Sequence, residues 1–236
     1  MATFLVAHGA WGAGWAWKKM HPLMSGLGHR LITPTYTGLG EREHLSNPDI
    51  NLDTHIQDIL NVIKYEGLKN FILIGHSYGG MVATGVADIA GEIISRLVYL
   101  DAFVPLDGQC LFDLVPKENR ERSVEITKKI GDGWKLPPNP MPEDTPGEDR
   151  LWAEPLRRPQ PILTVQQPIR LTRGSLPMPV SYIFCTIGDT PFEKFARRAQ
   201  EEGWDYHEIH ATHNPQITAP QELAALLNHI VLEDQG

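Results

Sequence analysis

Runs rich in apolar residues alternate along the chain with stretches in which apolar residues recur every three or four positions. The runs predict buried strands, and they lie at residues 4–7, 30–33, 71–74, 96–100, 180–185 and 204–209. The recurring pattern predicts amphipathic helices, at residues 51–67, 191–202 and 219–232. In the first of these, Thr54 and Gln57 have the spacing of a capping box, which predicts where that helix begins. Strand, turn and helix alternate, so we predict an α/β domain with a mostly parallel, twisted sheet flanked by helices.

The pattern changes in the middle of the chain, where 13 of the 19 prolines lie between Pro105 and Pro179. Prolines at this density interrupt helices and are disfavoured in central strands. We therefore predict a small cap at residues 105–178, inserted after the strand that ends at Leu100. The core then consists of residues 1–104 and 179–236.

Short helices are expected inside this cap, for example near residues 118–129. A disordered linker is the alternative interpretation of the same composition. Trp134 and Trp152 argue against it, because large apolar side chains favour burial.

Composition narrows the class of protein. A chain of 236 residues that is 42% hydrophobic can form one sizeable domain. Its net charge of −8 disfavours nucleic acid and anionic membranes as partners. Cys110 and Cys185 are too few for a disulfide framework and lack metal-ligand spacing, so no metal or cofactor is expected. With no basic N-terminal region and no apolar run near ~18 residues, we predict a cytoplasmic protein. Its oligomeric state stays open between a monomer and a homodimer.

The clearest chemical signal is Gly75-His76-Ser77-Tyr78-Gly79, a G-x-S-x-G pattern that directly follows an apolar strand and precedes a helical stretch. A sharp strand-to-helix turn holds its central serine in a strained conformation, and glycines flank it because side chains there would collide with neighbouring elements. Ser77 is therefore the candidate nucleophile.

A glycine-rich turn follows the first strand, at His8 to Gly14. Such a turn leaves backbone N–H groups pointing into open space, as an oxyanion hole requires. We predict the amide of Ala10 as one donor and that of Tyr78, directly after the nucleophile, as the other. Gly9 and Trp11 are expected to line the substrate pocket. A nucleotide site is disfavoured, because the turn lacks G-x-G-x-x-G order.

A serine hydroxyl needs a histidine to accept its proton and a carboxylate to orient that histidine. Where the serine lies on a strand-to-helix turn, the acid and then the histidine follow it in the chain. His213 fits best, since it lies in a loop directly after the last predicted strand. His210 is the second candidate.

Taken together, these motifs resemble those of the α/β-hydrolase superfamily, and within it the branch of plant methyl-ketone, methyl-salicylate and hydroxynitrile-lyase-type enzymes with their bacterial esterase relatives. The resemblance spans most of the chain, from the turn that starts at His8 to the Thr-Ala-Pro helix start at Thr218. It is weak in the predicted cap. It implies an α/β-hydrolase fold and a small-molecule ester as substrate.

The chain departs from the hydroxynitrile lyases of this branch at two positions. They carry a threonine after the first-strand histidine and a lysine after the catalytic histidine, where this chain has Gly9 and Asn214. A cyanide leaving group has no lysine to stabilise it here. The resemblance therefore implies an esterase that acts through an acyl-enzyme on Ser77, with a carbon–carbon hydrolase or lyase and a receptor-like ligand binder as alternatives.

The position of the acid stays open between two aspartates. In the plant enzymes the acid follows the strand that matches residues 180–185, and alignment there places Gly188 at the acid's position, one residue before Asp189. Some superfamily members carry the acid after an earlier strand, in a sequence like that around Asp101. The ends of these two strands can lie side by side, so we favour Asp101 and keep Asp189 as the alternative.

Overall fold

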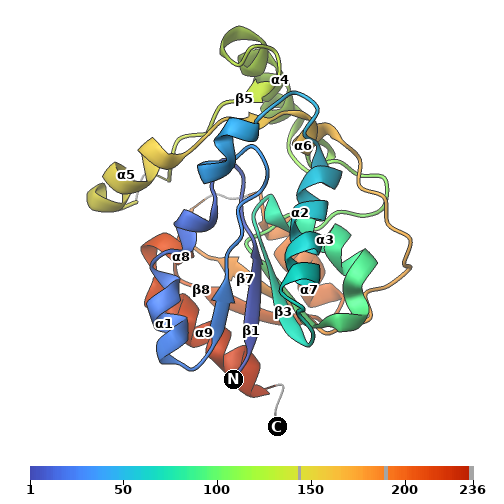
Figure 1. The fold of residues 1–236 in the computed structure, drawn as a ribbon, viewed down its shortest axis with the longest axis vertical. Coiled ribbons are helices and arrows are strands. Elements are labelled where there is room, and N and C mark those ends of the chain that lie inside the picture. The colour runs from blue at the N-terminus through green and yellow to red at the C-terminus, as the bar shows by residue number, and fades with distance from the viewer. Residues whose placement is uncertain (143–144, 189–190, 234–236) are drawn as a thin grey trace.

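The computed structural model describes residues 1–142, 145–188 and 191–233 (Figure 1). Its main sheet has six strands in the order β2-β1-β3-β4-β7-β8, and every neighbouring pair is parallel. The strands are β1 (Thr3–Ala7), β2 (Arg30–Ile32), β3 (Phe71–His76), β4 (Ile94–Leu100), β7 (Val180–Cys185) and β8 (Asp205–Ile209). The predicted α/β fold with a parallel sheet is confirmed.

Helices cover both faces of this sheet because successive strand residues point to opposite sides. Leu5, Leu73 and Leu97 pack against one set of helices, namely α2 (Leu52–Tyr65), α3 (Gly79–Ala90) and α7 (Glu193–Glu201). Their neighbours Val6 and Ile74 pack on the other side, against α1 (Met20–Gly26) and α9 (Pro220–Glu233). Two apolar layers therefore enclose the sheet.

The start of α2 differs from the predicted capping pair. Asn51 caps this helix, since its side chain accepts a hydrogen bond from the Thr54 amide at 3.0 Å. The Thr54 hydroxyl in turn lies 3.4 Å from the Asn51 amide, which completes the capping box. Asparagine is among the best N-cap residues, so the box lies three residues earlier than the Thr54–Gln57 spacing indicated.

The long connection between β4 and β7 lies at the end of the molecule to which the strands' carboxyl ends point (Figure 1). Its described part holds short elements, and α4 confirms the helix expected near residues 118–129. These elements are η4 (Leu111–Asp113), α4 (Lys117–Ile130), β5 (Lys135–Leu136), α5 (Gly147–Ala153), η5 (Glu154–Leu156), β6 (Gln160–Pro161) and α6 (Leu163–Gln166). Strands β5 and β6 form a separate antiparallel pair. The boundaries at residues 105 and 178 stay a prediction.

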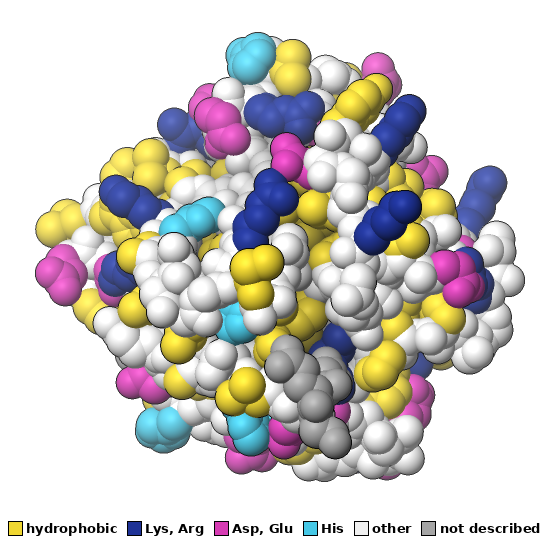
Figure 2. All heavy atoms as spheres, turned by 60° about the horizontal axis from the view of Figure 1, so that its bottom comes forward, with side chains coloured by type: hydrophobic (Ala, Val, Ile, Leu, Met, Phe, Trp, Pro, Cys, Tyr) yellow, Lys and Arg dark blue, Asp and Glu magenta, His cyan; other side chains and the backbone are white. Residues whose placement is uncertain are grey.

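The remaining short helices are η1 (Gly14–Trp17), η2 (Gly40–Leu45), η3 (Gly91–Ile93) and α8 (Pro215–Thr218). Among the described residues, none of the helices combines the length and apolar character that crossing a membrane requires. On the face drawn in Figure 2, lysine and arginine side chains are interspersed with acidic ones. Cytoplasmic location and oligomeric state stay predictions.

Candidate active site

Ser77 occupies the sharp turn between β3 and α3. Its φ of 57° lies in the left-handed region, which costs a non-glycine residue roughly 1–2 kcal/mol. The flanking glycines make the turn possible. A Cβ on Gly75 would lie 2.8 Å from Ala83 Cβ, and one on Gly79 would lie 1.9 Å from the Ala7 carbonyl oxygen. The strand, the turn and the helix can therefore pack together only if these positions lack side chains.

The structure brings Ser77, His213 and Asp101 together from three separate loops. His213 Nε2 lies 2.9 Å from Ser77 Oγ, and His213 Nδ1 lies 2.7 Å from Asp101 Oδ2. Asp101 follows β4 and is fully buried. Both distances are those of good hydrogen bonds. A proton on Nδ1 directed at the carboxylate leaves Nε2 free to accept the serine proton.

Neighbouring groups fix the orientation of the His213 imidazole. The Phe192 ring stacks on it with centroids 4.8 Å apart and planes 8° apart. His76 Nε2 donates to the His213 carbonyl oxygen at 2.8 Å. Burial, helped by the nearby His213, lowers the pKa of His76 to about 3. His76 is thus neutral near pH 7 and does not add a repelling charge beside His213.

The other sequence candidates are Asp189 and His210. Asp189, the alternative acid, lies outside the described residues. His210 is an exposed side chain whose Nδ1 lies 3.3 Å from Thr186 Oγ1. Among the described residues, the side chain that meets His213 Nδ1 is therefore that of Asp101.

Ala10 and Tyr78, whose backbone amides are the predicted oxyanion donors, both line the same cavity as Ser77. Within the described part of the chain, neither amide donates a hydrogen bond to a protein group. Gly9 lies against Ser77, because a Cβ at Gly9 would lie 3.2 Å from Ser77 Cβ and 3.0 Å from His76 Nδ1. A larger residue at position 9 would crowd the serine.

Trp11 is held by the connection between β4 and β7. Its amide donates to Gln160 Oε1 at 3.1 Å, and its indole Nε1 donates to the Leu136 carbonyl at 3.1 Å. Its carbonyl accepts from the Arg158 amide at 3.1 Å. Trp11 has a φ of 60°, so these three bonds hold a conformation that a non-glycine residue seldom adopts. The loop that carries Ala10 is therefore held in place by hydrogen bonds to the connection between β4 and β7.

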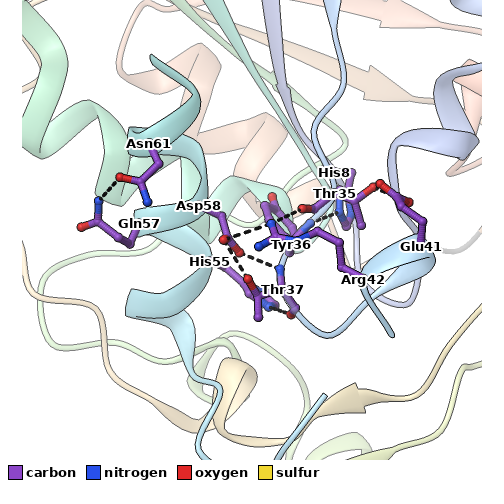
Figure 3. A network of polar contacts seen from close by, with 10 residues as sticks. All are labelled: His8, Thr35, Tyr36, Thr37, Glu41, Arg42, His55, Gln57, Asp58 and Asn61. Carbon is purple, nitrogen blue, oxygen red and sulfur yellow. Dashed lines mark hydrogen bonds and ion pairs between the residues drawn. The ribbon is translucent and has the colours of Figure 1, made fainter. Parts of the chain in front are cut away.

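A polar network joins Thr37 to His55 and Asp58 on α2 (Figure 3). The Tyr78 hydroxyl lies 2.9 Å from His55 Nδ1, and His55 Nε2 donates to the Thr37 carbonyl at 3.2 Å. The Thr37 amide donates to Asp58 at 2.6 Å. Burial lowers the pKa of His55 to about 3. The neutral His55 ring therefore links the Tyr78 hydroxyl to the Thr37 carbonyl. This network ties Tyr78, which lines the cavity, to α2.

A cavity of about 810 Å³ opens beside Ser77. Apolar and aromatic side chains form much of its lining near the serine, among them Trp11, Phe103, Leu111 and Phe192. Two arginines, Arg122 and Arg157, also line it. A mostly apolar cavity with a few polar groups is typical of a small-molecule site.

A second group of polar residues lies on β8 and α9. Asp205, His207 and Glu233 each place a potential ligand atom within 4.8 Å of the others. However, Arg96 Nη1 lies 3.1 Å from Asp205 Oδ2 and already offsets that carboxylate's charge. This group is therefore a weak candidate for a cation.

Comparison with known proteins places the chain in a family. Residues 4–226 match the model of the alpha/beta hydrolase family, and the chain belongs to this family. It is 36% identical over 241 residues to the carbendazim hydrolyzing esterase of Nocardioides sp. (strain SG-4G), a match that covers 96% of this chain and 98% of that esterase. At this identity over nearly the whole of both proteins, the chain is a hydrolase of the carboxylesterase type.

Other relatives support the predicted branch. The alpha-hydroxynitrile lyase of Arabidopsis thaliana is 27% identical over 130 residues, which are 55% of this chain and 48% of the lyase. An extracellular alpha/beta-hydrolase from a Paenibacillus species, described as homologous in structure and function to tobacco salicylic acid binding protein 2, has a TM-score of 0.84 at 28% identity. That match covers 96% of this chain and 98% of the other. The resemblance stated from the motifs is confirmed.

Proposed function

We propose that this protein hydrolyses carboxylic esters of small molecules through an acyl-enzyme on Ser77. The observation that carries the proposal is the continuous pair of hydrogen bonds from Ser77 Oγ to His213 and from His213 to Asp101, at 2.9 and 2.7 Å. The similarity to an esterase over nearly the full chain supports the same reaction.

In the first half-reaction, Ser77 Oγ attacks the ester carbonyl carbon while His213 Nε2 takes the serine proton. The carbonyl electron pair moves onto its oxygen, which the amides of Ala10 and Tyr78 stabilise. Each amide contributes about 3 kcal/mol to the transition state. When the carbonyl re-forms, the alcohol leaves and takes the proton from His213. The acyl group stays on Ser77.

In the second half-reaction, His213 removes a proton from water and the resulting hydroxide attacks the acyl carbon. Ser77 leaves as the alcohol when it regains the proton from the imidazolium. Asp101, buried beside His213 Nδ1, holds the imidazole in the tautomer that the reaction needs and stabilises its positive charge. The connection between β4 and β7 acts as the cap that excludes bulk water.

A lyase reaction is the alternative that the partial match to the alpha-hydroxynitrile lyase favours. Gly9 and Asn214 argue against it, since Asn214, directly after His213, offers no cation to a departing cyanide. A receptor that only binds a ligand is disfavoured for another reason. A binder has no use for the strained φ of Ser77.

The deciding experiment measures hydrolysis of p-nitrophenyl esters from acetate to decanoate by the wild type and by Ser77→Ala. We expect serine-dependent turnover, and the preferred chain length then sizes the acyl pocket. Carbendazim, the substrate named for the Nocardioides relative, is a further compound to test. No turnover, together with no labelling of Ser77 by a fluorophosphonate, refutes the esterase proposal and favours the lyase or receptor.

A further inference from the structure

The charged side chains in the active-site cavity are of one sign. Among the residues that the structure describes, Arg122 and Arg157 line it, and no aspartate or glutamate does. His8 and His76 also line the cavity, but burial lowers the pKa of each to about 3 and keeps them neutral. The described lining residues therefore bring two permanent positive charges to the cavity, in a chain whose net charge is −8.

Arg157 lacks a carboxylate partner in the described part of the chain. Glu154, whose charge reaches it, is instead paired with Arg150 at 3.1 Å. Arg157 Nη1 donates to the Asn139 carbonyl, which uses one of the five N–H donors of a guanidinium. Burial lowers the pKa of Arg157. An ionised carboxylate in the cavity would complement the guanidinium donors that the Asn139 carbonyl leaves unused.

Arg157 also lies beside the oxyanion loop. Its guanidinium carbon is 5.6 Å from the centre of the Trp11 ring. Trp11 directly follows Ala10, the proposed donor to the acyl oxygen. The cation therefore contacts the residue next to the proposed donor, on the wall of the cavity that Ser77 also lines.

Resting on the proposed ester hydrolysis, we propose that Arg157 binds an ionised carboxylate on the acyl group, and that the preferred substrates are half-esters of dicarboxylic acids. Planar guanidinium and carboxylate groups match in a two-point hydrogen bond. The free donors of Arg157 can make this bond while its contact with Trp11 holds the side chain in place.

The test compares monomethyl esters of dicarboxylic acids, from succinate to sebacate, with the same methyl esters in which the free carboxylate is replaced by a carboxamide. The two groups have nearly the same shape but differ in charge. For the best chain length we expect kcat/KM at least about tenfold higher for the carboxylate. Arg157→Gln should remove this preference, and Arg157→Lys should keep part of it.

Arg30→Gln is the matched control. Its side chain is paired with Glu66 and, unlike that of Arg157, is not among the described cavity-lining residues. The variant loses the same charge away from the cavity and should keep the preference. Equal kcat/KM for carboxylate and carboxamide in the wild type, with serine-dependent turnover of both, overturns the inference and leaves ester hydrolysis standing. Loss of the preference in Arg30→Gln as well overturns the assignment to Arg157.

The wild-type comparison and Arg157→Lys keep the test decisive even if Arg157→Gln does not fold. Absence of turnover for every ester, with no fluorophosphonate labelling of Ser77, overturns the proposed function and the inference together. The two failures are therefore distinguishable.

Discussion

Replacing Gln160 by leucine should slow the reaction without contact between Gln160 and the substrate. Gln160 is fully buried, and its Oε1 accepts the amide proton of Trp11 at 3.1 Å. Leucine leaves that buried N–H unpaired, at a cost of about 1–3 kcal/mol. The left-handed conformation of Trp11 stores roughly 1–2 kcal/mol more. Relaxation of the turn releases this strain and moves the neighbouring Ala10 amide.

The size of the effect follows from what the Ala10 amide contributes. An oxyanion donor stabilises the transition state by about 3 kcal/mol, and a displaced donor loses part of this. We expect kcat to fall by about 10- to 100-fold, which corresponds to roughly 1.4–2.7 kcal/mol. KM should change much less, because the donor acts mainly in the transition state. The free energy of unfolding should fall by about 2 kcal/mol.

Steady-state kinetics on the best p-nitrophenyl ester and urea unfolding measure both quantities. Gln167→Leu is the matched control, since Gln167 bonds to Asp53 nearer the surface and does not contact Trp11 among the described residues. It should keep wild-type kcat. A folded Gln160→Leu enzyme with wild-type kcat and wild-type fluorophosphonate labelling rate would refute the claim that this bond positions the oxyanion loop.

Three further outcomes are expected. Asp101→Asn should lower kcat on p-nitrophenyl esters by about 10⁴-fold. A loss smaller than ~10²-fold contradicts the assignment of the acid. Gly79→Ala should give no soluble enzyme, because its Cβ would lie 1.9 Å from a carbonyl oxygen of β1; expression and gel filtration check this. Burial lowers the pKa of His8, His55 and His76 from 6.5 to about 3, so the unfolded chain binds more protons below pH 6.5. Unfolding free energy, from urea titrations, should be insensitive to these groups above pH 7.5 and fall by up to about 4 kcal/mol per pH unit between about pH 5 and pH 3. A flat profile in that range contradicts their neutral burial.

The sequence predicts the fold well because the strands of a parallel sheet are buried on both sides. Such strands are continuous apolar runs, as at β3, and glycine patterns mark the turns between strands and helices. Ser77 and His213 could be proposed from these positions. The predicted Thr54–Gln57 capping pair of α2 is wrong, because Asn51 is itself a good N-cap residue and forms the capping box with Thr54.

The supporting residues could not be predicted, because they are close only in three dimensions. Gln160 is 149 positions from Trp11, and His55 is 23 positions from Tyr78. Nothing in the local pattern around Gln160 or His55 indicates such a partner. Buried polar side chains of this kind are set by tertiary packing. The two arginines among the described lining residues of the cavity are likewise brought together only by folding.

The order of the strands explains why the sequence offers both Asp101 and Asp189 as the acid that orients His213. Strands β4 and β7 are parallel neighbours, and Leu100 pairs with Ile183. Their carboxyl ends therefore lie side by side in the sheet, which is why the sequence offers an acid after either strand for the same histidine. The bond from the Cys185 amide to Asp101 Oδ1, at 3.3 Å, directly joins the two ends. An acid can thus move from one strand to the other in evolution without disturbing the histidine that it orients.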